Sequence, residues 1–273
     1  MRALWGAVAA LVAAVPGFAN DVGTGFGGKP IYIQADEFED ERKRDSWAGQ
    51  LGFGLVLEPQ FIGASEHVAS VGLDLKISYK DWLFIENNRI GAVLHHSRFL
   101  RGGVIGRWNL GRRDVGGLDA FGTITDVDQA FEVGVFAATS LYKLFLTGEL
   151  YFGVSDQLKG SSFELEAGYT FEPDSEWRIT PILGAVWGSS RYQQTFFGVP
   201  EGIPEVAVYN PRGGLYQIYG ELATERRLGK NWLLKGSLRF SELLHGAADS
   251  PIVQLDGGSR EQVEAFAGIV WLF

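Results

Sequence analysis

The chain has 273 residues, of which 46% are hydrophobic and 13% aromatic, with 37 glycines, no cysteine and a formal net charge of −9. The acidic balance gives no electrostatic reason to bind nucleic acid, so we exclude a nucleic-acid partner. No apolar run of about eighteen residues follows the N-terminal segment, which excludes a membrane-spanning helix there, and the lack of cysteine excludes stabilisation by disulfides.

Residues 1–19 have the composition of a secretory signal peptide. Arg2 precedes a short apolar stretch, and Gly17 and Ala19 are the small residues expected before a cleavage site. We therefore expect this peptide to be cleaved as the chain is secreted through the inner membrane. Residues 20–46 are polar and rich in charge, without a sustained period, and we predict a flexible periplasmic N-terminal segment, within which residues 30–34 could pair locally.

From residue 47 to residue 273 the sequence is a succession of short segments in which apolar and polar residues alternate. A period of two indicates strands, and no linker interrupts them, so we predict one domain. The expected strands are 47–57, 67–79, 82–86, 89–96, 98–110, 129–140, 141–155, 161–171, 177–190, 213–227, 230–244 and 260–273. The fold class is all-β, a transmembrane antiparallel up-and-down β-barrel of twelve strands.

The connections between these strands alternate in length. With a periplasmic start, the external ones are 58–66, 87–88, 111–128, 156–160, 191–212 and 245–259, whereas the periplasmic ones are brief turns such as 172–176. Long loops outside and short turns inside are typical of bacterial outer-membrane barrels. We therefore locate the protein in the cell outer membrane, and only the tight 87–88 turn departs from the pattern.

The polar faces of the strands carry too many charges for a dry core. The apolar faces must then meet lipid and the polar faces must line the lumen. The predicted acidic lumen residues are Asp74, Glu132, Glu149, Glu164, Glu166, Glu221 and Glu264. The basic ones are Lys76, Arg101, Arg107, Lys143, Arg178, Lys235 and Arg239. A balanced set predicts a lumen that is crossed by ion pairs and is narrow or closed, because a selective pore tends to show an excess of one sign.

The last expected strand ends on an apolar face that finishes in an aromatic residue. Bacterial outer-membrane barrels commonly end this way, and we interpret Gly268, Trp271 and Phe273 as the signal that the barrel assembly machinery reads. Together with outer-membrane lipid and lipopolysaccharide, this machinery is an expected partner.

Several polar motifs are candidates for chemical sites. His95 and His96 are adjacent in a strand and point to opposite faces, so they cannot share a metal. His245, Asp249 and Ser250 allow a Ser–His–acid arrangement, although the same segment reads equally well as a turn. We predict no catalytic residue, cofactor or metal.

Two further motifs lie in the connections. Asp126 and Asp128 are too few ligands for calcium. Arg112 and Arg113 could clamp lipopolysaccharide phosphates, or could instead belong to a solvated loop and pair with Asp114 and Asp119.

Four segments carry a resemblance to a known family. They are "GFGLVLEPQFIGAS" at 52–65, "DVDQAFEVGVFA" at 126–137, "YQQTFFGV" at 192–199 and "GAADSPIV" at 246–253. In this order they resemble the MipA/OmpV family of outer-membrane proteins, named after the MltA-interacting protein. The sequence differs from the family pattern at Phe61 and Ile62, where the family more often has an aromatic residue followed by an acidic one. The resemblance does not extend to the residues before 47.

The resemblance implies an outer-membrane β-barrel that acts as a scaffold joining a murein transglycosylase to a penicillin-binding protein. It implies no catalytic residues. The alternatives that stay open are a narrow porin-like channel, a surface adhesin or antigen and, more weakly, a hydrolase that uses the rim around His245.

Overall fold

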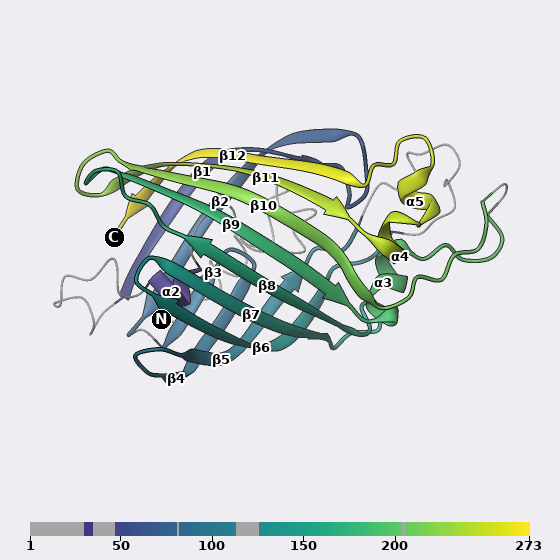
Figure 1. The fold of residues 1–273 in the computed structure, drawn as a ribbon, viewed down its shortest axis with the longest axis horizontal. Helices are drawn as coiled ribbons and strands as arrows, with labels where there is room; N and C mark the ends of the chain where they lie inside the picture. Colours follow the sequence, from purple (N-terminus) through teal and green to yellow (C-terminus); the bar gives the residue numbers. More distant parts are fainter. Residues whose placement is uncertain (1–29, 35–46, 81, 113–125, 204–205) are drawn as a thin grey trace, which may run out of the picture.

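The computed structural model describes residues 30–34, 47–80, 82–112, 126–203 and 206–273. Its twelve strands are β1 (Trp47–Pro59), β2 (His67–Tyr79), β3 (Leu83–Glu86), β4 (Arg89–His96), β5 (Arg101–Asn109), β6 (Ala130–Leu141), β7 (Leu144–Gly153), β8 (Ser161–Tyr169), β9 (Trp177–Gly188), β10 (Gly214–Arg227), β11 (Trp232–Leu243) and β12 (Glu261–Leu272). Each strand pairs antiparallel with its neighbours in sequence, and β1 pairs with β12, so the sheet is a closed barrel (Figure 1). The prediction of a twelve-stranded antiparallel barrel is confirmed.

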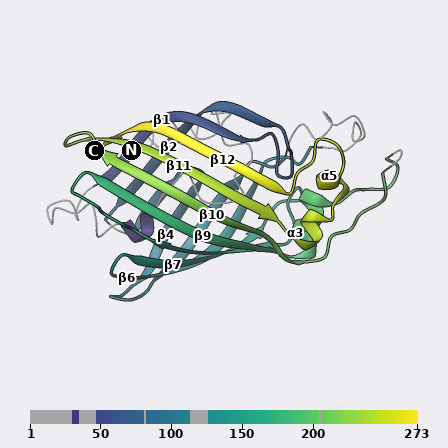
Figure 2. The ribbon, with the colours of Figure 1, turned by 45° about the horizontal axis from the view of Figure 1, so that its top comes forward.

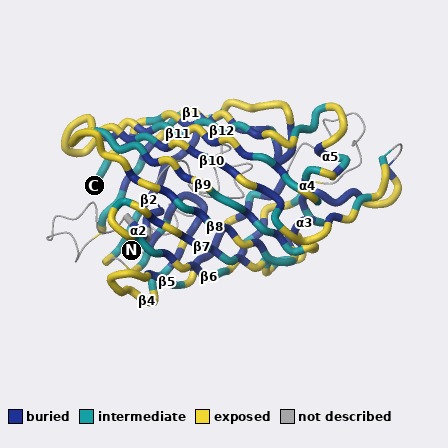
Figure 3. Tube along the Cα trace, in the orientation of Figure 1, coloured by how far each residue is buried: buried dark blue, intermediate teal, exposed yellow. Residues whose placement is uncertain are grey.

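The strands form because their side chains alternate between two very different surroundings. In β7, Leu144 and Leu146 are exposed on the outside of the wall, whereas the alternate residues Phe145, Thr147 and Glu149 are buried inside. Figure 3 shows the same alternation of buried and exposed residues along the wall. A barrel with an apolar outer surface and a polar interior is a membrane-spanning barrel, and the chain is an outer-membrane barrel.

One end of the barrel carries both Trp47 and Phe273, and by the rule of short periplasmic turns it is the periplasmic end. Five exposed tryptophans mark the two edges of the wall, as an aromatic girdle does; they are Trp47, Trp82, Trp108, Trp232 and Trp271. In the part of the chain that the structure describes, no helix is long and apolar enough to span a membrane.

The β3–β4 hairpin explains why the 87–88 turn departed from the loop pattern. Asn87 and Asn88 are buried, and the hairpin ends within the wall instead of at the external edge. The Asn87 side chain accepts a hydrogen bond from the Leu75 N–H at 2.8 Å, and the Asn88 side chain donates to the Trp108 carbonyl at 3.0 Å. Two amide side chains thus bond the backbone of β2 and β5 where the hairpin stops.

The external end is covered by three short helices, α3 (Ser190–Phe197), α4 (His245–Ala248) and α5 (Pro251–Gln254). Figure 2 shows α3 and α5 gathered at this end. A buried apolar cluster joins α3 and α4 to the upper wall, and it includes Tyr192, Phe196, Phe197, Tyr216 and Leu243. We call this packed layer the external cap.

The periplasmic end holds a fourth helix, α2 (Ile31–Gln34), which the sequence placed in a flexible segment. Ile31 and Ile33 are buried in a cluster with inward side chains of the wall, among them Phe84, Phe136 and Phe145. Apolar side chains at 31 and 33 bury more favourably against these aromatic rings than in water. Residues 30–34 therefore pack against the inside of the wall.

Candidate functional site: a charged lumen between two closures

Eleven of the fourteen predicted lumen residues are buried inside the barrel. They are Asp74, Lys76, Arg101, Arg107, Glu132, Glu149, Glu164, Glu166, Glu221, Lys235 and Arg239. Glu264, on β12, is only partly buried. The inward positions follow from strand alternation, which fixes the face of a residue within a regular strand.

Lys143 needs a correction, because it lies in a turn at the periplasmic edge, whereas Arg178 is on the inward face of β9 at the periplasmic mouth of the lumen, 3.9 Å from Glu225. Lys143 precedes β7 in a turn, where alternation no longer holds, and its Nζ lies 2.9 Å from Glu172 Oε2. Arg178 Nε lies 3.3 Å from Glu172 Oε1. These contacts, the hydrogen bond from Lys143 first, hold the pKa of the Glu172 carboxyl below its usual value.

The first chain of charges crosses the lumen from β2 to β7. Lys76 Nζ is 2.7 Å from Glu86, and Arg89 lies 3.4 Å from the other oxygen of that carboxylate. Arg89 also pairs with Glu149 at 3.2 Å, and the Tyr151 hydroxyl donates to Glu149 at 2.7 Å. The prediction missed Glu86 and Arg89 because they flank the tight 87–88 turn, where the alternating pattern is too short to assign a face.

The second group joins β5, β6 and β8. Arg107 donates to Glu132 from Nε at 2.9 Å and lies 2.8 Å from it through Nη2. The same guanidinium donates to Ser162 at 3.2 Å and lies 3.9 Å from the ring centroid of Tyr151. Asn109 donates a further bond to Glu132 at 3.1 Å. An ion pair with this many additional partners is well compensated for its burial.

The third group joins residues that are far apart in sequence. Lys235 on β11 lies 2.6 Å from Asp74 on β2, and Gln50 on β1 donates to the other oxygen of Asp74 at 2.6 Å. Lys235 also lies 3.6 Å from Glu225, an acid that the prediction missed. The side chains of Asp74 and Lys235 are 0% and 2% exposed, so this pair is shielded from solvent.

The fourth group is centred on a tyrosine. Arg239 lies 2.6 Å from Glu221, and its guanidinium lies 4.5 Å from the Tyr219 ring centroid. The Tyr219 hydroxyl is 2.7 Å from Glu164 and 2.5 Å from Glu166. A phenol has one proton, so both contacts can be hydrogen bonds only if one of the two carboxyl groups is protonated.

Gly184 on β9 allows this arrangement. It faces the Tyr219 ring, and a Cβ built on it would collide with the ring atoms. Any larger residue at 184 would push the hydroxyl of Tyr219 away from the two carboxyl groups.

Among the described residues, the buried acidic side chains number nine and the buried basic ones seven. One of these bases, Arg112, belongs to the external cap, so the predicted seven-to-seven balance shifts toward acid, mainly because Glu58, Glu86 and Glu225 are also buried. With Glu164 and Glu166 sharing one hydroxyl, most of the remaining acids have a basic partner. The interior is a network of ion pairs and hydrogen bonds between the external cap and α2.

The C-terminal residues lie at the seam of the barrel, where the last strand, β12, pairs with the first, β1. Trp271 points outward and is 42% exposed, and its ring centroid lies 5.1 Å from that of Phe273. The Phe273 N–H donates to the Gly49 carbonyl at 3.0 Å, and the Gly49 N–H returns a bond at 3.1 Å. Gly268 pairs with Gly54 across the same seam.

Arg112 is buried in the external cap, which does not favour the lipopolysaccharide clamp, one of the two alternatives that the sequence leaves open. It is 3% exposed, and its guanidinium donates to the Phe196 carbonyl at the end of α3. Burial lowers its pKa to about 10. Arg112 therefore anchors the external cap, and its former companion Arg113 lies outside the described residues.

The Ser–His–acid alternative does not agree with the local geometry either. Ser250 is 0% exposed, its hydroxyl donates to the Phe197 carbonyl at 2.7 Å, and its oxygen accepts the Ile252 N–H as the N-cap of α5. The hydroxyl is thus used to hold the cap together. His96 is exposed and lies 3.3 Å from Arg101, and no group of three His, Asp or Glu side chains with metal-binding spacing occurs in the described residues.

The family model described as MltA-interacting protein MipA matches residues 51–273, and the chain belongs to this family. A comparison with curated proteins finds no match.

Several solved structures of outer-membrane proteins are similar at low identity. OmpT of Vibrio cholerae shares 8% identity at a TM-score of 0.39, with 84% of this chain and 97% of that chain covered. The NanC porin shares 6% at 0.45, covering 83% and 100%. DcaP of Acinetobacter baumannii shares 8% at 0.39, covering 84% and 96%. At these TM-scores the likeness carries no inference about function.

Proposed function

We propose that this MipA-family barrel is a non-enzymatic scaffold of the outer membrane and not an open pore. The observation that supports this most is the closure of the lumen at both ends. The external cap packs Tyr192, Phe196 and Phe197 across one end, and Ile31 and Ile33 of α2 occupy the other. Between them, buried charged side chains pair with one another, as Lys235 does with Asp74 and Arg107 with Glu132, and this supports a lumen without an open path for ions.

The partner that we propose lies in the periplasm. The description of the family names an interaction with MltA, and we extend it to a murein transglycosylase and a penicillin-binding protein for this chain. The groups available to such a partner at the periplasmic end include the turn 172–176, which carries Glu172, Asp174 and Glu176. Among the described turns at that end it is the one richest in acidic residues.

Co-purification tests this proposal. The native protein, cross-linked in cells and extracted in detergent, is expected to bring down murein enzymes. Replacing residues 172–176 by glycine and serine should reduce the yield, whereas the same replacement in the external loop 156–160 should not. Recovery of no murein enzyme with the wild type would contradict the partner, and equal yields from both variants would contradict the contact surface.

A narrow channel is the second candidate, and one observation favours it. The α2 closure is a single helical turn, held by two isoleucines and by a 3.4 Å contact from the Ile31 N–H to Glu86. So short a segment can leave the lumen at a small free-energy cost. Single-channel recording in planar bilayers separates the two candidates, because a large, steady and selective wild-type conductance would replace the scaffold by a channel.

A variant with Ile31→Asp and Ile33→Asp tests in the same recordings whether α2 alone blocks the lumen. If only α2 blocks the path, the variant should conduct where the wild type does not. If the external cap and the ion pairs also block it, as we propose, both proteins should stay silent.

We also propose cleavage after Ala19 and insertion by the barrel assembly machinery through the last strand. Sequencing the N-terminus of the protein from outer membranes tests the first point. A mature chain that still begins at Met1 would contradict it.

A further inference from the structure

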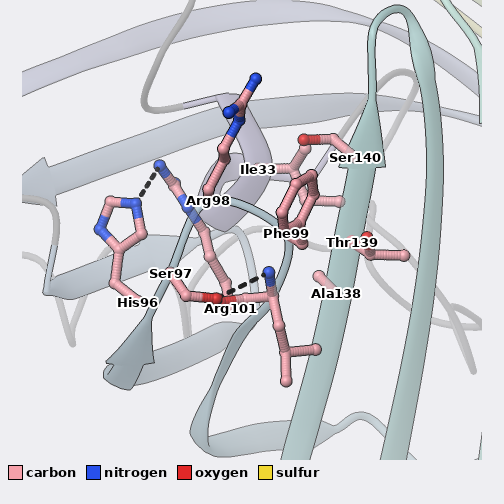
Figure 4. Close-up of a pocket in the computed structure, with 10 residues that line it drawn as sticks. Ile33, His96, Ser97, Arg98, Phe99, Arg101, Ala138, Thr139 and Ser140 are labelled. Carbon is pink, nitrogen blue, oxygen red and sulfur yellow. Dashed lines mark hydrogen bonds between the residues drawn. The ribbon is translucent and has the colours of Figure 1, made fainter.

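A small cavity of about 170 Å³ lies at the periplasmic end, between the β4–β5 turn, the end of β6 and α2 (Figure 4). Its walls include His96, Arg98 and Arg101 on one side and Thr139 and Ser140 on the other. None of its described lining residues is Asp or Glu. In a chain with a net charge of −9, this is a local concentration of positive charge.

The basic groups are held in different ways. Arg101 is 7% exposed and lies 3.3 Å from the ring of His96, an arrangement that fixes its guanidinium. Arg98 is exposed, and its guanidinium lies 5.4 Å from the ring centroid of Phe99. Figure 4 shows both arginines rising from the turn beside the α2 ribbon. Ser97 bonds Leu100 in both directions, which fixes the turn that carries them.

The cavity also has an apolar side. Ile33 and Ala138 are buried members of the inner cluster, and Phe99 is 62% exposed at the cavity's edge. Because Ile33, Ala138 and Arg101 belong to the inside of the barrel, the cavity is continuous with the lumen side and not with the lipid-facing wall. A ligand must therefore arrive from the periplasm.

We propose that this cavity binds the carboxylate of a periplasmic peptide that has an apolar side chain beside it. A guanidinium offers two parallel N–H donors that match a carboxylate, and Thr139 and Ser140 add hydroxyl donors. Phe99 and Ile33 would receive the apolar side chain. A volume of about 170 Å³ accommodates roughly one amino-acid residue. The inference does not depend on whether the lumen is closed.

Fluorescence anisotropy tests the site with the full-length protein in a neutral detergent. The probe is dansyl-Gly-Gly-Phe with a free carboxylate, compared with its C-terminal amide and with dansyl-Gly-Gly-Gly. The free acid is expected to bind. The amide should bind about tenfold more weakly, because it cannot form the charge-assisted hydrogen bond that a carboxylate forms. The triglycine should also bind more weakly, since it lacks the apolar group.

Variants at Arg98 locate the binding, because this exposed residue can change without disturbing the wall. Arg98→Gln should weaken peptide binding about tenfold. Arg98→Lys should retain only part of the wild-type affinity, because an ammonium group lacks the planar pair of N–H donors of a guanidinium. Lys159→Gln removes an exposed charge from an external loop and should have no effect.

Four results would overturn the proposal. They are equal binding of acid and amide, equal binding of the phenylalanine and glycine peptides, unchanged binding by Arg98→Gln, and displacement of the probe by inorganic phosphate or by anionic lysolipid at the concentration at which the peptide itself binds. The last result would assign the cavity to a phosphate, free or in a lipid headgroup.

Discussion

Removing Lys235 tests whether the lumen is as dry as its packing indicates. In Lys235→Met the carboxylate of Asp74 keeps only the hydrogen bond from Gln50, in surroundings where its own side chain is 0% exposed. Removing one partner of a buried ion pair leaves the other charge buried without compensation and lowers the free energy of unfolding by about 3–5 kcal/mol. The lost contact to Glu225 adds little, because that acid is 10% exposed and lies 3.9 Å from Arg178.

The double variant Asp74→Asn, Lys235→Met should recover most of this loss. Asparagine has the shape of aspartate without the charge, and it can still bond Gln50, so we expect stability within about 1 kcal/mol of the wild type. Lys230→Met, in an exposed periplasmic turn, is the matched control and should change stability by less than about 0.5 kcal/mol. Urea titrations of the barrel in liposomes, followed by tryptophan fluorescence, measure all four proteins.

Two results would refute the reasoning. If Lys235→Met cost less than about 1 kcal/mol, water would have to reach Asp74 and take the place of the lysine. If the double variant were as unstable as Lys235→Met, the loss would come from packing of the lysine stem and not from the unpaired charge.

Three further predictions concern other parts of the wall. Leu146→Arg should destabilise the barrel by about 2–4 kcal/mol, and Tyr142→Arg in the exposed turn by about 0–1 kcal/mol; equal costs in liposome titrations would contradict the assignment of faces. Glu172→Gln should lower the urea midpoint at neutral pH and not at pH values well below 4.5, because a depressed folded-state pKa contributes stability that is lost as pH falls through it; a difference that persists in acid would show that the effect is not ionic. Deleting Phe273 removes both backbone bonds to Gly49 at the seam, so the protein should accumulate unassembled in cells; normal surface levels of the truncated protein would contradict this role.

The sequence was sufficient for the wall of the barrel. Alternation placed the strands close to their observed bounds, and it assigned Leu146 to lipid and Glu149 to the lumen correctly. The reason is that the contrast between hydrocarbon and a polar interior imposes a period of two on every regular strand. The resemblance of the loop segments to the MipA/OmpV family was confirmed by the match over residues 51–273.

Alternation failed wherever a strand gave way to a turn. It assigned Lys143 to the lumen although this residue lies in a turn, and it missed Glu86 and Arg89 beside the 87–88 turn. A turn rotates the chain out of the pleat, so the two-residue period carries no information about the direction of its side chains. The same limit left α2 unrecognised, because four residues are too few to show a helical period.

Only the tertiary structure decided which charges meet and what closes the barrel. Asp74 and Lys235 are 161 residues apart, and their 2.6 Å contact depends on how β2, β1, β12 and β11 are staggered around the wall. Arg112 became a cap anchor for the same kind of reason, since the position of α3 over it is set by packing at the external end. A sequence fixes the face on which a side chain lies through local alternation, but its partner across the lumen depends on strand register and closure, which are properties of the whole barrel.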